Sequence, residues 1–218
     1  RVGQIQFDTA RMPVSSDGGF EDLLNYVAST TPMRSVADAE AWIARLEALP
    51  GYYRDNVANA RRGIKTGFTQ PKPTIDIILA RAKAAAAAPI EGDPLLRPFR
   101  TLPDGVDATR WAALRTRAEG VVRDKIRPVQ RDFATFIEKE YAPAARKSLG
   151  VRVTPGGEAY YRFAVKDFTT TDKTPDEVFA LGESEVARIR AQMLVIMKET
   201  GFTGDLPAFI AMLRKDPK

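Results

Sequence analysis

The chain has 218 residues, of which 44% are hydrophobic and 28% charged, a composition typical of a globular fold rather than of a disordered chain. It contains neither histidine nor cysteine, which excludes serine–histidine triads, cysteine–histidine pairs and histidine- or cysteine-ligated zinc within these residues. The net charge of +5 comes with no basic cluster interleaved with aromatic residues, so we expect no nucleic-acid partner.

The N-terminal stretch reads RVGQIQFDTA and has neither a signal peptide nor an initiator methionine, which suggests a processed or trimmed start. No run approaches the roughly 18 apolar residues that cross a bilayer, so we expect no membrane span. Residues 1–34 are predicted to be an irregular lead-in with one short helix at 20–29.

A series of helices follows this lead-in. Ser35 and Asp38 have the spacing of an N-cap and its acidic partner, and Pro50-Gly51 predicts the end of that helix. Further helices are expected at 52–66 and from Pro73 to about residue 87. The short connection at Pro50-Gly51 predicts that the helices on its two sides are antiparallel neighbours.

Proline and glycine are dense in residues 89–106, which predicts a long surface connection. It would separate a helical subdomain at 35–88 from a long-helix subdomain at 107–218 that continues beyond residue 218 in the full-length protein. Asp107 is expected to cap a long helix that Pro128 kinks. The predicted fold is therefore all-α, with about eight helices in an irregular antiparallel bundle and no convincing sheet.

The best-marked helix of the chain lies near its end. Thr174 is a natural N-cap, Pro175 suits the first helical position, and Glu177 completes a capping box. Gly201 can end the helix in a left-handed conformation, and Asp205 is expected to cap a last helix at 206–214. Apolar residues recur along it at nearly helical spacing: Val178, Leu181, Val186, Ile189, Met193 and Ile196.

Two short stretches before this helix are candidates for ligand contact. Tyr160 and Tyr161 follow a Pro-Gly-Gly turn that could present both phenols to a substrate. Thr170 and Asp172 lie in the hydroxyl-rich segment 169–172, which could form the lip of a polar pocket. The alternative is structural: one tyrosine packs inside, and the threonines satisfy backbone groups between two helices.

Several segments of the chain, taken together and in order, resemble the bacterial domain-of-unknown-function 885 family: ARRGIKTGFTQPK, PGGEAYY, TTTDKTPDEV, LGESEVARI and FIAMLRKDP. The resemblance implies the N-terminal half of a helical zincin-like fold in an exported or periplasmic, often lipid-anchored, zinc metallopeptidase. The zinc motif of that family lies in its C-terminal half, so the resemblance implies no catalytic or metal-binding residue and no cofactor in this segment.

On this resemblance, the chain is a noncatalytic scaffold and substrate-channel wall, with Tyr160, Tyr161, Thr170 and Asp172 nearest the cleft. Its partners would be the remaining C-terminal half of the same protein and a peptide substrate. Such a half should expose an apolar patch on its final two helices, or hide the patch in a homodimer. The alternative is a stand-alone helical binding module for a protein or an anionic partner.

Overall fold

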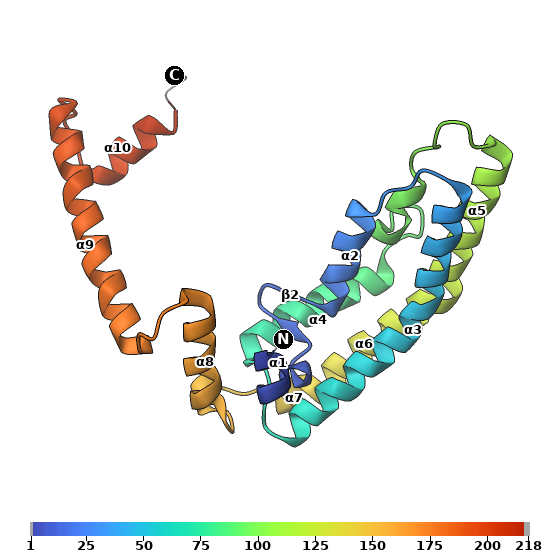
Figure 1. Cartoon of the computed structure of the whole chain (residues 1–218), viewed down its shortest axis with the longest axis horizontal. Helices are drawn as coiled ribbons and strands as arrows, with labels where there is room; N and C mark the ends of the chain where they lie inside the picture. The colour runs from blue at the N-terminus through green and yellow to red at the C-terminus, as the bar shows by residue number, and fades with distance from the viewer. Residues whose placement is uncertain (1, 216–218) are drawn as a thin grey trace. The chain divides into compact units, whose positions relative to one another are not determined.

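The helices form two separate units (Figure 1), at residues 1–161 and 162–218. The computed structural model describes the backbone of residues 2–215, and the side chains from residue 5 onward. The all-α prediction is confirmed, with one small hairpin added near the N-terminus. The predicted connection at 89–106 lies inside the first unit, and the division into subdomains at 35–88 and 107–218 stays a prediction.

The lead-in is more regular than we predicted. The helix expected at 20–29 is confirmed as α2, which begins at Phe20 directly after the hairpin. The elements in this part are α1 (Val2–Phe7), η1 (Thr9–Arg11), β1 (Val14–Ser15), β2 (Gly18–Gly19) and α2 (Phe20–Thr30).

The longest helix of the first unit is α3 (Val36–Lys65), and it corrects one prediction. Its N-cap is Ser35, whose hydroxyl accepts the Asp38 backbone N–H at 3.2 Å, as predicted. The predicted break at Pro50-Gly51 is wrong, because the helix continues through Pro50. The two expected antiparallel helices are therefore one helix.

The packing of α3 explains why the proline does not end it. Its buried side chains continue across the proline, with Leu46 and Leu49 before it and Tyr53 and Ala60 after it. Along this stripe α3 lies beside α5 and α6, as Figure 1 shows. Burial along the whole helix outweighs the hydrogen bond that Pro50 removes.

The partner of α3 is a nearly continuous helical run with two wider turns. It consists of α5 (Ala108–Val121), the π-helical turn η3 (Val122–Ile126), α6 (Arg127–Phe136), the π-helical turn η4 (Ile137–Tyr141) and α7 (Ala142–Ala144). Each π-helical turn ends two residues before a proline, Pro128 or Pro143. A wider turn leaves room for the proline ring, so the helical run continues past both prolines, and the predicted kink at Pro128 stays a prediction.

The buried hydrophobic residues described in the first unit form two clusters, and the remaining elements contribute to them. Helix α4 packs against α6, and Trp42 of α3 donates its indole N–H to the Leu95 carbonyl of η2 at 3.0 Å. Residues 151–153 form a 3-10 turn. The elements are α4 (Lys72–Ala87), η2 (Pro94–Phe99), η5 (Val151–Val153) and α8 (Gly157–Thr169), which continues into the second unit.

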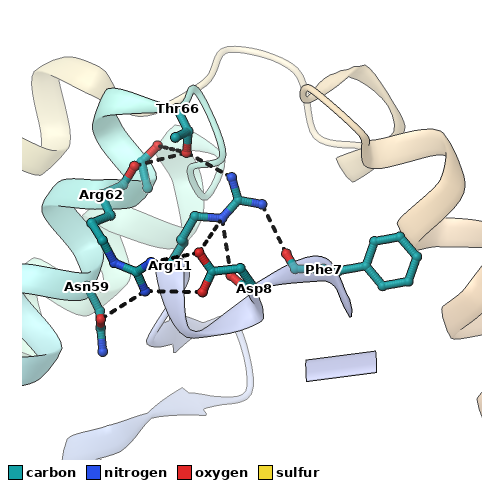
Figure 2. A network of polar contacts seen from close by, with 7 residues as sticks. Phe7, Asp8, Arg11, Asn59, Arg62 and Thr66 are labelled. Atoms are coloured by element: carbon teal, nitrogen blue, oxygen red, sulfur yellow. Dashed lines mark hydrogen bonds and ion pairs between the residues drawn. The ribbon is translucent and has the colours of Figure 1, made fainter. Parts of the chain in front are cut away.

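A polar network fastens the N-terminal segment to the end of α3 (Figure 2). Arg11 donates to the Thr66 hydroxyl at 2.9 Å and to the Phe7 carbonyl at 3.0 Å. Arg62 of α3 donates to both carboxylate oxygens of Asp8 at 2.8 and 3.1 Å. The Arg11 guanidinium also lies 4.4 Å from the ring centroid of Phe68. The segment is thus held by charge-assisted bonds and by stacking.

The contact of the N-terminal segment with the end of α3 requires a glycine at position 63. We therefore expect Gly63→Ala to destabilise the first unit. An added Cβ would lie 2.3 Å from the Arg11 carbonyl oxygen and 2.9 Å from that of Phe68, both backbone atoms. The resulting backbone shift should lower the free energy of unfolding by about 1–3 kcal/mol. Urea unfolding followed by circular dichroism measures this change. The matched control is Gly120→Ala in α5, where the nearest atom to the new Cβ would be 3.6 Å away. Gly120→Ala should raise the free energy of unfolding by roughly 0.5–1 kcal/mol. Equal effects of the two substitutions would contradict the close approach at Gly63.

The second unit consists of the end of α8, α9 (Pro175–Glu199) and α10 (Leu206–Leu213). The predicted start of α9 is confirmed, since Thr174 and Glu177 form a reciprocal capping box. Gly201 has the left-handed φ of +69° that we expected after the helix. The predicted Asp205 cap of α10 is also confirmed, at 2.9 Å from the Ala208 N–H.

Candidate functional site

The two predicted tyrosines lie next to each other on α8 but in different surroundings. Tyr160 is half-buried, with its ring centroid 5.6 Å from that of Phe7 and 5.8 Å from that of Phe68, both edge-on. Tyr161 is 36% exposed, and the Arg152 guanidinium lies 5.9 Å from its ring centroid. Tyr160 therefore packs in an aromatic cluster, and Tyr161 presents its side chain more openly to a ligand.

Thr170 and Asp172 lie in the turn between α8 and α9, in the second unit. Thr170 has the left-handed φ of +54°. Asp172 accepts a hydrogen bond from the Lys166 ammonium at 2.5 Å, and this bond holds the pKa of Asp172 below its usual range. Asp172 also lines a hollow of about 170 Å³ together with Lys173 and other residues of the same unit. The turn is organised by local contacts, and the four predicted residues are divided between the two units.

An apolar-lined pocket of the first unit was not predicted. It lies in the first unit between α2, α4, α6 and the start of η2, and it has a volume of about 370 Å³. Small side chains of α4 leave the space beside α6. The lining residues are Glu21, Asp22, Leu24, Asn25, Tyr53, Arg81, Ala82, Ala84, Ala85, Ala88, Asp93, Pro94, Leu95, Arg127, Gln130 and Phe133.

An ion pair between Arg127 and Asp93 forms the floor of this pocket. The two side chains are 6% and 3% exposed, and Arg127 Nη2 lies 2.8 Å from Asp93 Oδ2. Asp93 also accepts the Leu95 backbone N–H at 2.8 Å, which caps η2. Arg127 donates to the Ala88 carbonyl at 2.9 Å, at the C-terminal end of α4, and to Gln130 Oε1 at 2.6 Å. The pair thus joins α4, α6 and η2.

Two acidic residues of the first turn of α2, Glu21 and Asp22, also line the pocket. Asp22 accepts the Gly19 backbone N–H at 3.0 Å and forms an ion pair with Arg81 of α4. The carboxylate of Glu21 folds back against Gly19, where a Cβ would lie 2.4 Å from Glu21 Oε2. A glycine before α2 therefore makes room for the Glu21 carboxylate.

Burial changes the ionisation of two of the pocket groups. Desolvation is the main cause that raises the pKa of Glu21, and the neighbouring Asp22 adds to it, against the opposing effects of its own backbone N–H and of Arg81. Desolvation also raises the pKa of the Tyr53 phenol, so Tyr53 stays neutral and keeps its hydroxyl hydrogen.

Two polar atoms at this pocket lack the hydrogen bonds that buried groups usually make. Among the described side chains, three buried atoms have no hydrogen-bond partner: Glu21 Oε2, Arg127 Nε and Trp111 Nε1. The first two belong to residues that line the pocket. Unsatisfied buried groups call for an occupant such as water, an ion or a ligand.

One sequence signal could have indicated part of this site. Arg127 lies seven residues before the buried Ala134 on the same helical run, so a charged residue occupies an inward position. Such an arginine needs a buried partner. Its partner Asp93 lies 34 positions earlier in the Pro/Gly-rich connection, and no local pattern links the two.

Residues 2–215 contain no group of three or more His, Cys, Asp or Glu side chains that could hold a metal, and the sequence has no histidine or cysteine. Across the same described residues, no helix is both long enough and apolar enough to cross a membrane.

Comparison with known proteins shows similarity to a protein family and to a solved structure. The family model described as "Bacterial protein of unknown function (DUF885)" matches residues 3–218. The fold is similar to the crystal structure of "the putative lipoprotein from Colwellia psychrerythraea", with 20% sequence identity and a TM-score of 0.83 over 94% of this chain. The chain spans only 35% of the length of that structure. Among curated proteins, no match to the chain is found.

Proposed function

Because the chain belongs to the DUF885 family of bacterial proteins, we propose that it is the noncatalytic N-terminal helical portion of a longer, exported, zinc-dependent peptidase. In this proposal the zinc and its ligands belong to the remaining C-terminal half, and the present helices serve as a scaffold and as one wall of the substrate channel. The similar crystal structure supports a longer protein, since this chain spans 35% of it, and its lipoprotein description is compatible with export.

The observation that carries this proposal is the uncovered apolar face of α9. None of the residues of α9, all of which the structure describes, is buried. Phe179, Val186, Ile189 and Ile196 lie at helical spacing on one face and are 69%, 67%, 46% and 53% exposed. An apolar face of this length is typical of an interaction surface, and its proposed occupant is the C-terminal half of the same protein.

The second candidate is a stand-alone helical binding module, with a protein or an anionic partner on the exposed surface. The net charge of +5 favours an anionic partner. Salt-sensitive binding of an anionic polymer by the 218-residue chain would support this candidate, whereas a longer protein in which α9 is covered by the C-terminal half would contradict it.

The channel role is tested with the full-length protein in a zinc-dependent peptidase assay. The substitutions are Tyr161→Ala, Tyr161→Phe and the paired change of Thr170 and Asp172 to alanine, with Tyr26→Ala of α2 as the control at a 65% exposed tyrosine. A channel wall contributes binding to the substrate, so we expect the alanine variants to raise KM by about 3–10-fold at unchanged kcat. Tyr160 is tested as Tyr160→Phe, which preserves its packing.

Two outcomes would sink the proposal. The first is a full-length protein that hydrolyses no peptide after zinc is supplied, because the family activity would then be different. The second is normal hydrolysis with KM values that match the Tyr26→Ala control in every variant, because the four residues would then lie away from the substrate.

A further inference from the structure

The pocket of the first unit has a charge balance that points to a ligand. Five charged residues line it, three acidic and two basic. Arg81 is paired with Asp22, and Arg127 is paired with Asp93. Each basic residue is thus matched with one acid, and Glu21 is the acid left over.

Glu21 is also poorly stabilised by the protein itself. Its Oε2 atom is buried and accepts no hydrogen bond from the described residues. A desolvated carboxylate oxygen without a donor is costly, and a bound positive charge removes most of that cost. The lining also contains the Arg127–Asp93 ion pair, whose side chains are 6% and 3% exposed, so the site includes buried polar groups and not surface acids alone.

The rest of the lining is suited to a small organic body. The rings of Tyr53 and Phe133 lie in the wall, and aromatic faces attract cations. Alanines of α4 form the opposite wall, with Leu24 and Leu95. The volume of about 370 Å³ is at the small end of the range for ligand pockets. A bare metal ion is less suited, because only one carboxylate is unpaired and a metal needs several ligands.

We propose that this pocket binds a small primary ammonium compound, whose charged end pairs with Glu21 and whose short apolar body lies against the α4 alanines and the rings of Tyr53 and Phe133. The site shares no residue with the proposed channel wall and does not depend on peptidase activity. It assigns a role to Glu21 and to Gly19.

The experiment uses the full-length protein and three probes of similar shape: n-pentylammonium, n-pentanol and pentanoate. Binding is measured by calorimetry and by ligand-observed NMR. We expect n-pentylammonium to bind about 10-fold more tightly than n-pentanol, since a charge-assisted pair is worth roughly that factor, and pentanoate to bind most weakly. Three probes that bind equally, or no binding of any, would overturn the proposal and leave trapped water as the occupant.

Two variants localise the preference. Glu21→Gln removes the charge with little change in shape and should abolish the 10-fold preference for the ammonium probe. Gly19→Ala keeps the charge but displaces the Glu21 carboxylate, because the new Cβ would lie 2.4 Å from Oε2; the φ of −134° at Gly19 is one that alanine adopts.

The matched control is Glu91→Gln, which removes an exposed carboxylate that does not line the pocket. It should leave the preference intact. A preference that survives Glu21→Gln, or that disappears equally in Glu91→Gln, would show that the ammonium probe binds elsewhere and would overturn the proposal.

Discussion

Replacement of Asp93 by asparagine is expected to lower the free energy of unfolding of the first unit by about 3–5 kcal/mol. The change removes the counter-charge of Arg127, whose side chain is 6% exposed and cannot regain its hydration. Asparagine retains a side-chain oxygen that can accept the Leu95 N–H, so the cap of η2 is preserved. The decrease in the free energy of unfolding is therefore the cost of leaving the Arg127 charge unpaired. Urea unfolding followed by circular dichroism measures this decrease.

The control for this prediction is an exposed ion pair on the same unit. Lys83 Nζ lies 2.6 Å from Glu138 Oε1, and the two side chains are 53% and 42% exposed. Water screens such a pair, so Glu138→Gln should cost less than about 1 kcal/mol. If Asp93→Asn costs no more than this control, Arg127 is hydrated in solution and the pair is not buried there.

A double variant separates charge from packing. Arg127→Met combined with Asp93→Asn replaces the buried pair by an apolar side chain and a neutral amide. We expect it to recover part of the loss caused by Asp93→Asn alone, because no unpaired charge remains. A double variant as unstable as the sum of the two single ones would indicate that the hydrogen bonds of Arg127 to Ala88 and Gln130 carry the stability instead.

The sequence predicted helix starts better than helix ends. Caps are local, and the predicted ones at Ser35, Asp107, Thr174 and Asp205 are all confirmed as side-chain acceptors of backbone N–H groups. The predicted break at Pro50-Gly51 is wrong because burial on both sides of the proline is a tertiary effect. Such an effect has no signature within a few residues.

The pocket also depends on tertiary packing, which no local sequence pattern predicts. Glu21, Arg81, Asp93 and Arg127 come from four separate segments, and only the packing of α2, α4 and α6 brings them together. The signals that the sequence made prominent, such as the tyrosine pair and the threonine-rich turn, have local explanations in the structure. A charged residue at an inward position, as Arg127 is, was the more informative signal.

Amide hydrogen exchange of α9 is expected to be the largest difference between the 218-residue chain and the full-length protein. In the short chain none of its residues is buried, and most helical stability in proteins comes from the tertiary packing of an apolar face. If the C-terminal half covers the apolar face, the central amides of α9 should exchange at least about 100-fold more slowly in the full-length protein. The buried stripe of α3 at Ile43 and Leu46 is the internal control and should change little.

A pair of substitutions on α9 makes this prediction specific to the proposed face. Ile189→Lys places a charge on the apolar face, whereas Gln192→Lys places the same charge at an exposed polar position of the same helix. In the full-length protein only Ile189→Lys should restore fast exchange, because burying an unpaired ammonium is costly. In the 218-residue chain neither should matter. Equal protection of α9 in the two proteins would mean that the C-terminal half does not dock on this face, and the role of α9 as its docking surface would then be wrong.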